Sequence, residues 1–276
     1  MITIPALTSP TLLRLDYVSP GEDSAAIAFS FAHPVARRAV GTLRPIDDPP
    51  ASAPMLPEQG IEILFVPVPL NDDGHWKEGA RTWMAAGRGT AGFAIRAGDM
   101  HVQWRPGRAV IAAPAHSAHD ALESVVECSY YESVLQQIEQ AIGSGWNDVE
   151  ADTSLAYAAH PPDLENEVEV GQRMQRVMQT RLRLSRIEPA LLRSAEHLCS
   201  TARELGEALR DAALCEDRLE TADGQIETQE YVYELASQRL GESRHARQGF
   251  VLEMAIIILL AAEVVLIIFD ILRNLE

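Results

Sequence analysis

Near its C-terminal end the sequence contains the apolar stretch FVLEMAIIILLAAEVVLIIFDIL, which spans Phe250–Leu272. A bilayer-spanning helix requires about 20 predominantly apolar residues, and this stretch meets that length. Its sixteen Leu, Ile, Phe and Val residues contribute at most about −7 kcal/mol to membrane insertion. An ionised acid near the bilayer centre costs about 2.5–3.5 kcal/mol, and of the acids in the stretch only Glu263 lies near the middle. We therefore predict a single C-terminal transmembrane helix over residues 249–272, with a short tail over residues 273–276.

The acids inside the stretch predict a contact. Glu263 and Asp270 are seven residues apart and share one helix face, whereas Glu253 lies off that face and nearer one end. A carboxyl group inside a membrane usually points at a partner helix or a cavity rather than at lipid. We interpret the three acids as membrane or homo-oligomer contacts, with a protonated or hydrogen-bonded Glu263 as the main one and a proton relay as the alternative. The alternative for the whole stretch is the buried helix of a soluble bundle. Such a helix would show a polar stripe, and Met254–Ala262 contains none.

Basic residues flank the apolar stretch unequally. Arg239, Arg244 and Arg247 precede it, whereas Arg273 follows it. The positive-inside rule then places the N-terminal bulk of the chain in the cytoplasm and a few residues across the membrane. Met1–Val18 has no basic segment followed by an apolar core, so we expect no secretory signal peptide.

Composition excludes some classes of function. The formal net charge is −17, and sequence-independent nucleic-acid binding needs clustered Lys and Arg, so we expect no direct DNA binding. Cys128, Cys199 and Cys215 are odd in number and lack a C-x-x-C spacing. This pattern predicts buried thiols in a reducing compartment rather than a disulfide framework or a zinc site.

Residues 1–146 predict an α+β domain. The apolar runs that predict strands are Leu12–Val18, Gly60–Leu70, Gly92–Ala97, Met100–Arg105 and Arg108–Ala113. The prolines that end Gly60–Leu70 favour a sheet edge, and the turn Ala97-Gly98-Asp99 predicts a hairpin.

Helices and loops of residues 1–146 are predicted from the prolines, glycines and capping residues at their ends. Ser24–Arg38 is expected to be helical as far as His33-Pro34, and the proline-rich Arg44–Pro57 to be a loop. Ser117, with Asp120 three residues on, is expected to cap a long helix. This helix would run to Ile142, where Gly143-Ser-Gly145 ends it.

Residues 147–163 are interpreted as a linker and residues 164–248 as a charged helical hairpin, or coiled-coil stalk, that leads into the membrane. Its heptad seam is predicted at Leu191, Ala195, Leu198, Ala202, Leu205, Leu209 and Ala212. Pro189 is expected in the first turn of that helix. Asp223-Gly224 is expected to end it, and a last helix to begin at about Glu227.

Two motifs raise an enzymatic alternative. Gly87-Arg-Gly89-Thr-Ala-Gly92 matches G-x-G-x-x-G, but a strand-like segment follows it where a dinucleotide site needs a helix. His116, His119 and Asp120 offer metal ligands at a helix start without a partner cluster elsewhere. We therefore expect no cofactor, no metal and no catalytic residue, and keep a nucleotide- or metal-dependent enzyme as the alternative.

A basic cluster lies away from the membrane, at Arg173, Arg176, Arg181, Arg183 and Arg186. Arg173, Arg176 and Arg183 fall on one side of a helix, which suits an acidic partner, RNA or lipid headgroups. The alternative is a solvated face that pairs weakly with Glu165, Glu167 and Glu169.

The C-terminal third also resembles a known family. The matching residues are His245 and Arg247, Leu252-Glu253-Met254, Ile256-Ile257-Ile258 and Ala262-Glu263-Val264-Val265. They resemble the YagE/RMD family, the domain-of-unknown-function 155 group that includes the "required for meiotic nuclear division" mitochondrial proteins. Upstream, Gly92–Gly98 with Val102 and Trp104 looks like the family's hairpin, and Ala121–Ile142, with Ser129 and Tyr131-Glu132, like its central helix. Met254 stands where an aromatic residue is usual, as in a divergent bacterial member.

The resemblance implies an oligomeric inner-membrane protein without an established enzyme activity, and its mitochondrial members support translation at the membrane. We therefore expect a tail-anchored, self-associating inner-membrane scaffold or assembly protein. Its expected partners are the lipid bilayer, a second copy of the chain, and a protein partner or the translation machinery. A soluble helical-bundle interaction protein is the remaining alternative.

Overall fold

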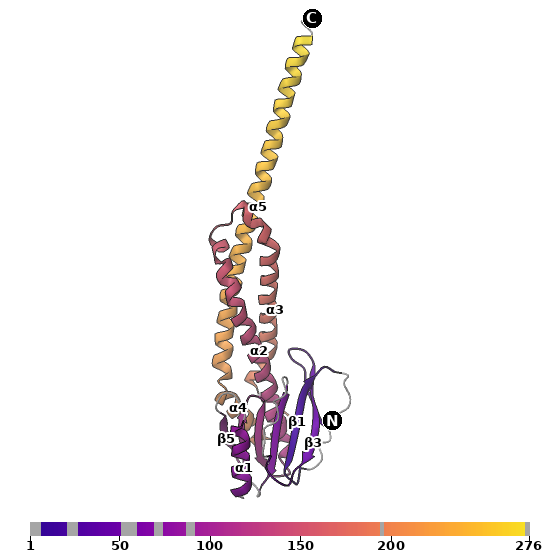
Figure 1. Ribbon diagram of the computed structural model, residues 1–276, viewed down its shortest axis with the longest axis vertical. Coiled ribbons are helices and arrows are strands. Elements are labelled where there is room, and N and C mark those ends of the chain that lie inside the picture. The colour runs from indigo at the N-terminus through magenta and orange to yellow at the C-terminus, as the bar shows by residue number, and fades with distance from the viewer. Residues whose placement is uncertain are drawn as a thin grey trace. The chain divides into compact units, whose positions relative to one another are not determined.

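Figure 1 shows the computed structural model, which describes residues 7–20, 27–50, 60–68, 74–86, 92–193 and 196–273. The chain divides into two compact units. Unit 1 contains residues 1–141 and 181–223, and unit 2 contains residues 142–180 and 224–276. Three long helices contribute residues to both units: α2 (Ala118–Tyr157), α3 (Glu167–Leu192) and α5 (Cys215–Arg273).

Unit 1 is built on a sheet whose described strands have the order β2-β3-β1-β4-β7-β6-β5. The strands are β1 (Thr11–Val18), β2 (Ile27–Phe31), β3 (Arg37–Pro45), β4 (Gly60–Pro67), β5 (Phe93–Ala97), β6 (Met100–Arg105) and β7 (Arg108–Ala113). Neighbours pair antiparallel except β4 and β7, which pair parallel. The predicted hairpin is confirmed, because Ala97 pairs with Met100 across the turn.

Helix α1 (Gly74–Ala85) packs on one face of the sheet, over β4 and β7. Trp76, Trp83 and Met84 of this helix pack on Leu64 and Val66 of β4. Residues two apart in a strand point to the same face, so β4 presents alternate residues to this helix. Helix α1 was not predicted from the sequence, although its buried residues Trp76, Ala80, Trp83 and Met84 follow the spacing of one helix face.

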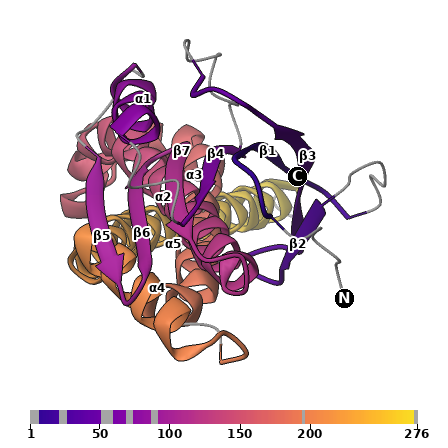
Figure 2. The same ribbon diagram turned by 90° about the horizontal axis from the view of Figure 1, so that it is seen from below.

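The opposite face is covered by α2 (Figure 2). Tyr130 of α2 packs edge-on against Tyr17 of β1, with ring centroids 5.1 Å apart, and stacks on Phe31 of β2 at 4.1 Å. The indole Nε1 of Trp104 in β6 donates a hydrogen bond of 2.7 Å to the Ser129 hydroxyl. The predicted N-terminal α+β part is therefore a sheet with helices on both faces.

Helix α4 (Ser200–Ala212) packs against β5 and β6. The hairpin turn at Gly98 has φ +56°, a conformation that L side chains rarely adopt. A Cβ atom built on Gly98 would lie 2.9 Å from Cγ2 of Thr201. Both the backbone conformation and the close approach of α4 therefore require glycine at this turn.

Two sequence predictions about the sheet are wrong. Ser24–Arg38 is not helical where it is described, because it contains β2 and the start of β3. The strand over Gly60–Leu70 does not lie at an edge, because β4 sits between β1 and β7. The predicted loop at Arg44–Pro57 is confirmed over residues 46–50, which follow the end of β3 at Pro45, and residues 51–57 lie outside the described residues.

The predicted helix ends are also wrong. Gly143-Ser-Gly145 lies inside α2, so most of the expected linker at residues 147–163 is helical, continuing into the 3-10 helix η2 (Pro161–Asn166). Asp223-Gly224 lies inside α5, and Pro189 lies near the end of α3 rather than in a first turn. The predicted heptad seam runs from the end of α3 along the whole of α4, so it does not belong to one helix, and its Ala195 lies outside the described residues.

Candidate functional site

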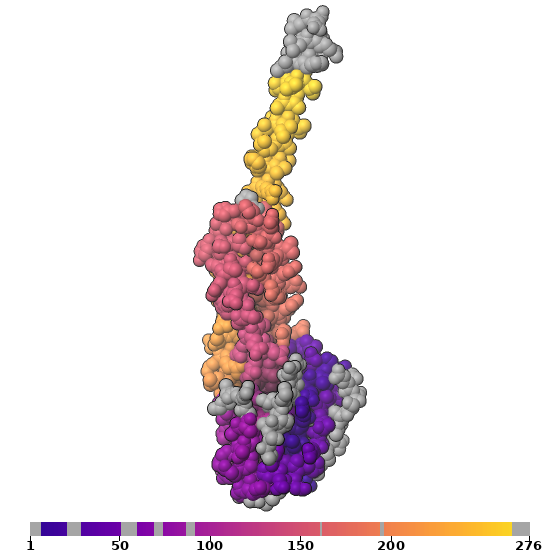
Figure 3. Space-filling view, in the orientation of Figure 1, coloured from indigo at the N-terminus to yellow at the C-terminus, as the bar shows by residue number. Residues whose placement is uncertain are grey.

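The C-terminal part of α5 is the most unusual surface that the structure describes. From Phe250 to Leu266 every residue is exposed, including the large apolar side chains of Leu252, Ile258 and Leu259. Figure 3 shows one side of this part of α5 in yellow, and no side chains of other elements cover most of its length on that side. The helix contains a window that is long and apolar enough to cross a membrane, and none of that window is buried.

Exposure on this scale distinguishes the segment from a core helix. Soluble monomers rarely expose contiguous apolar patches of more than a few hundred Å², and a buried bundle helix would cover one face of the segment. Glu253 and Glu263 are exposed on the same helix and make no hydrogen bond or ion pair with any described residue. The side chain of Asp270 lies outside the described residues.

The basic face predicted at Arg173, Arg176 and Arg183 is engaged within the chain. Arg173 forms ion pairs with Asp152 of α2 and with Glu169 one turn earlier. Hydrogen bonding to Asp152 is the main reason that the pKa of Arg173 is raised. The structure thus brings Arg173 to acids of its own chain.

The other two arginines of that face have weaker partners. Arg176 lies 3.6 Å from Asp148, and its side chain is two-thirds exposed. Arg183 belongs to unit 1, where it donates to the Gln137 side chain at 3.3 Å. The three arginines are therefore divided between the two units.

An ionic cluster that the sequence analysis missed lies in unit 1. Arg218 of α5 donates two hydrogen bonds of 2.8 Å to Glu139 and two of 2.8 Å to Glu132, both in α2. It also donates to the carbonyl of Ala213, at 3.2 Å. Hydrogen bonding to Glu139 is the main reason that the pKa of Arg218 is raised. The cluster joins residues 79 and 86 positions apart in the sequence, which no local pattern could reveal.

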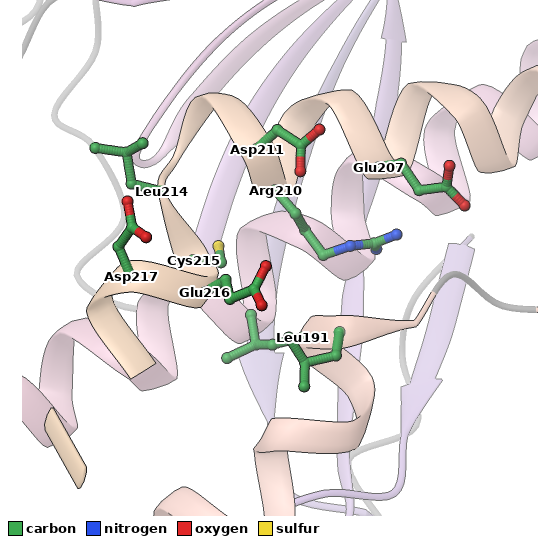
Figure 4. A pocket seen from close by; sticks show the side chains of 9 residues that line it. Leu191, Glu207, Arg210, Asp211, Leu214, Cys215, Glu216 and Asp217 are labelled. Carbon is green, nitrogen blue, oxygen red and sulfur yellow. The ribbon is translucent and has the colours of Figure 1, made fainter. Parts of the chain in front are cut away.

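A groove lies beside this cluster at the junction of α3, α4 and α5 (Figure 4). It has a volume of about 240 Å³, and a neighbouring hollow of about 540 Å³ shares Leu192 and Glu216 with it. Their acidic lining residues are Glu188, Glu207, Asp211, Glu216, Asp217, Glu220 and Asp223, against Arg181 and Arg210. A rim of this sign repels the phosphates of a nucleotide.

The motifs behind the enzymatic alternative do not form a site in the described residues. Residues 87–91 of the glycine-rich motif lie outside them, and the strand β5 follows Gly92 where a dinucleotide site needs a helix. His119 lies 3.6 Å from Glu123, which His197 contacts at 2.8 Å. Asp120 accepts a hydrogen bond from the Cys199 backbone. Within the described parts of the chain, no group of three metal-ligating side chains could hold an ion.

A buried ion pair strengthens the α1 face of the sheet. Arg108 of β7 is fully buried, lies 3.2 Å from Glu62 of β4, and donates to the Trp83 carbonyl at 3.0 Å. Its guanidinium also lies 4.5 Å from the centre of the Trp83 ring, within the range of a cation–π contact. This arrangement holds α1 on the parallel strand pair, which is a structural role.

The cysteines differ in accessibility. Cys128 and Cys215 are buried, whereas Cys199 is exposed, so the prediction of buried thiols is wrong for Cys199. Burial raises the pKa of Cys128, and burial also raises the pKa of Cys215 to about 11. Burial therefore leaves little of either thiol at pH 8 in the thiolate form, which is the reactive one.

We expect one thiol per chain to react rapidly with Ellman's reagent at pH 8 in mild detergent, and all three to react after denaturation. The fast phase should disappear in Cys199→Ser and persist in Cys128→Ser. Two or more fast-reacting thiols in the native protein would contradict the burial of Cys128 and Cys215.

No protein-family model and no curated protein matches the sequence. Among solved structures, the one described as "structure of the full-length CmaX protein" matches at 13% sequence identity and a TM-score of 0.35. The match covers 90% of this chain and 83% of that chain. A likeness at this TM-score supports no statement about the fold or the function.

Proposed function

We propose that the protein is a single-span membrane-anchored scaffold, whose apolar segment of α5 lies in the bilayer. The observation that carries the proposal is the uncovered apolar helix from Phe250 to Leu266. In water this surface would remain exposed, whereas a bilayer covers all faces of the helix at once. A helix also satisfies its own backbone hydrogen bonds, which a membrane core requires.

Unit 2 supports the scaffold role, because its helical segments are joined by polar contacts as well as by packing. Gln229 of α5 donates to the Ile142 carbonyl of α2 at 3.0 Å, and Arg244 of α5 pairs with Glu167 of α3 at 2.9 Å. Tyr233 of α5 is buried, and burial raises its pKa to about 12. The proposed stalk is thus a packed arrangement of segments from α2, α3 and α5 rather than the two-helix coiled coil expected from the sequence.

The proposal also includes the orientation of the chain, the kind of membrane in which it lies and the family that it resembles. Arg239, Arg244 and Arg247 precede the apolar segment, which favours cytoplasmic placement of both units. The resemblance to the YagE/RMD family favours an inner membrane and a role in assembly or membrane-associated translation. Carbonate extraction tests the anchoring, and protease digestion of sealed vesicles of either orientation tests the placement. Recovery of the wild-type protein in the carbonate supernatant would remove the proposal.

We further propose self-association through Glu263. Glu263→Leu is expected to leave membrane insertion intact and to raise the dimer dissociation constant about 3- to 30-fold, because an interhelical hydrogen bond in a membrane is worth about 0.6–2 kcal/mol. Glu263→Gln, which keeps a neutral hydrogen-bonding group, should retain most of the association. Crosslinking in native membranes and native mass spectrometry in detergent measure both variants. Equal oligomer populations in wild type and Glu263→Leu would exclude this contact.

A further inference from the structure

A second groove lies in unit 2, at the residue where the apolar segment begins. It has a volume of about 580 Å³ and is lined by Tyr157 and Ala159 at the end of α2 and by Arg239, Ser243, Arg247 and Phe250 of α5. Tyr157 and Phe250 are 81% and 63% exposed although they line it. Both rings therefore keep free surface for a ligand.

The charges of this groove are not balanced. Arg239 is paired with Glu242, another lining residue, at 2.8 Å. Arg247 lines the same groove and makes no hydrogen bond or ion pair with any described residue. The groove thus presents one uncompensated guanidinium beside an apolar wall, and a guanidinium binds phosphate oxygens through two parallel hydrogen bonds.

The position of Arg247 along α5 matches the headgroup layer of a bilayer. At 1.5 Å per residue, Arg247 precedes Phe250 by about 4.5 Å along the helix axis. The polar layer on each side of the hydrocarbon core is about 5–7 Å thick. If Phe250 marks the edge of the hydrocarbon, Arg247 lies at the level of the lipid phosphates, and Tyr157 is an aromatic residue of the kind that favours this interface.

We propose that this groove binds the headgroup of an anionic phospholipid from the membrane that holds the apolar segment. The proposal rests on the membrane anchoring of α5 proposed above. Arg247 binds the phosphate, the Tyr157 and Phe250 rings contact the glycerol backbone and the first methylenes, and Ala246 leaves room for the headgroup between them. A zwitterionic lipid offers the same phosphate with a compensating cation, so it gains less from the uncompensated arginine.

Lipid titration of the full-length protein in dodecyl maltoside micelles tests the site. Phosphatidylglycerol and phosphatidylcholine of equal chain length are added in increasing mole fraction, and the thermal unfolding midpoint is followed. We expect phosphatidylglycerol to give a saturable rise in the midpoint that phosphatidylcholine does not give. Arg247→Gln should raise the half-saturating mole fraction about fivefold, as expected for one arginine near a membrane surface.

Two further variants separate a site from diffuse charge. Arg244→Gln removes the same charge from the same helix one turn away, where Arg244 is paired with Glu167, and should leave the half-saturating fraction within twofold of wild type. Ala246→Trp keeps every charge but fills the groove, and should weaken binding as Arg247→Gln does. Equal losses in Arg244→Gln and Arg247→Gln, or an unchanged Ala246→Trp, would overturn the site.

The lipid titration and the carbonate extraction test the headgroup site and the membrane anchoring separately. If the protein resists carbonate extraction but responds equally to the two lipids, the headgroup site is wrong and the anchor stands. If the wild type is found in the carbonate supernatant, both proposals fail together. Stabilisation by soluble glycerol phosphate to the same extent would show that the apolar wall takes no part, and would overturn the lipid as the ligand.

Discussion

Replacing Ile258 and Leu260 with arginine is expected to move the protein from the carbonate-resistant membrane pellet into the supernatant. Each arginine near the helix centre costs about 2.5–3.5 kcal/mol and removes an apolar contribution of about 0.3–0.6 kcal/mol. The two substitutions together therefore remove about 6–8 kcal/mol, which is as large as the whole apolar contribution of about −7 kcal/mol.

The change should not disturb the folded units. Ile258 and Leu260 are 61% and 56% exposed in the absence of a bilayer, so the arginines break no packing within the chain. Near-ultraviolet circular dichroism and the pattern of limited proteolysis should match those of the wild type. The matched control, I258L/L260I, keeps the apolar character and should remain in the pellet. A pelleted, well-folded I258R/L260R protein would show that something other than this segment holds the chain at the membrane.

The second large effect is expected from Arg218→Leu, which should lower the free energy of unfolding by about 3–5 kcal/mol. Without Arg218, the Glu132 carboxylate remains buried with its main partner gone, since its side chain is only 5% exposed. For a unit of this size the loss corresponds to a drop of roughly 6–20 °C in the unfolding midpoint. The midpoint is measured on the full-length protein in mild detergent.

The pH dependence of the stability deficit of Arg218→Leu shows whether the Glu132 carboxylate causes it. Burial already raises the pKa of Glu132 in the folded protein, against the opposing effect of Arg218, and removing Arg218 raises it further. A folded-state pKa above the unfolded value means that stability is present below the unfolded pKa and is lost as pH rises through the folded pKa. The deficit of Arg218→Leu relative to wild type should therefore be larger at pH 8 than near pH 5.

A matched exposed pair provides the control for Arg218→Leu. Arg81 and Glu78 lie in unit 1 at 2.9 Å, with both side chains more than 60% exposed. Arg81→Leu should change the free energy of unfolding by less than about 0.5 kcal/mol, because exposed pairs contribute little. A deficit in Arg218→Leu that matches this control, or that does not depend on pH, would contradict the role assigned to the buried Glu132.

The features that the sequence predicted correctly are local ones. The apolar segment of α5, the strands β1, β6 and β7, and the hairpin turn at Gly98 each depend on residues that are close in sequence. Alternation in β6 is visible as Met100, Val102 and Trp104, all of which are buried. Where the period and the turn chemistry agree, no distant contact is needed to make the prediction.

The errors arise where tertiary packing overrides local preference. Gly145 looks like a helix end, but it lies inside α2 where a Cβ would lie 3.4 Å from the Gln229 side chain of α5. A glycine inside a helix costs about 1 kcal/mol relative to alanine, but α2 continues through Gly145, where the Gln229 side chain donates to the nearby Ile142 carbonyl. Similarly, the alanines of Ser24–Arg38 favour a helix, whereas pairing with β3 makes Ile27–Phe31 a strand.

The candidate sites were predictable only in part, for the same reason. The apolar segment needs no partner to be recognised. The state of the basic face cannot be predicted without its partners, because the acid that engages Arg173 most closely, Asp152, is 21 residues away on another helix. The lipid groove combines residues of α2 and α5 that are about 90 positions apart. Helical periodicity gives the face on which a residue lies, but not what meets that face.

The discontinuous make-up of unit 1 has a consequence for biosynthesis. Its sheet and the first part of α2 are complete by residue 141, but the unit also needs residues 181–223, which supply Arg218 to Glu132. The ribosome adds about 5–20 residues per second, so the 32 residues from Arg218 to Phe250 take only about 2–6 s to synthesise. The last piece of unit 1 is therefore synthesised only seconds before the apolar segment. Under the proposed anchoring, the completion of unit 1 competes in time with delivery of that segment to the membrane.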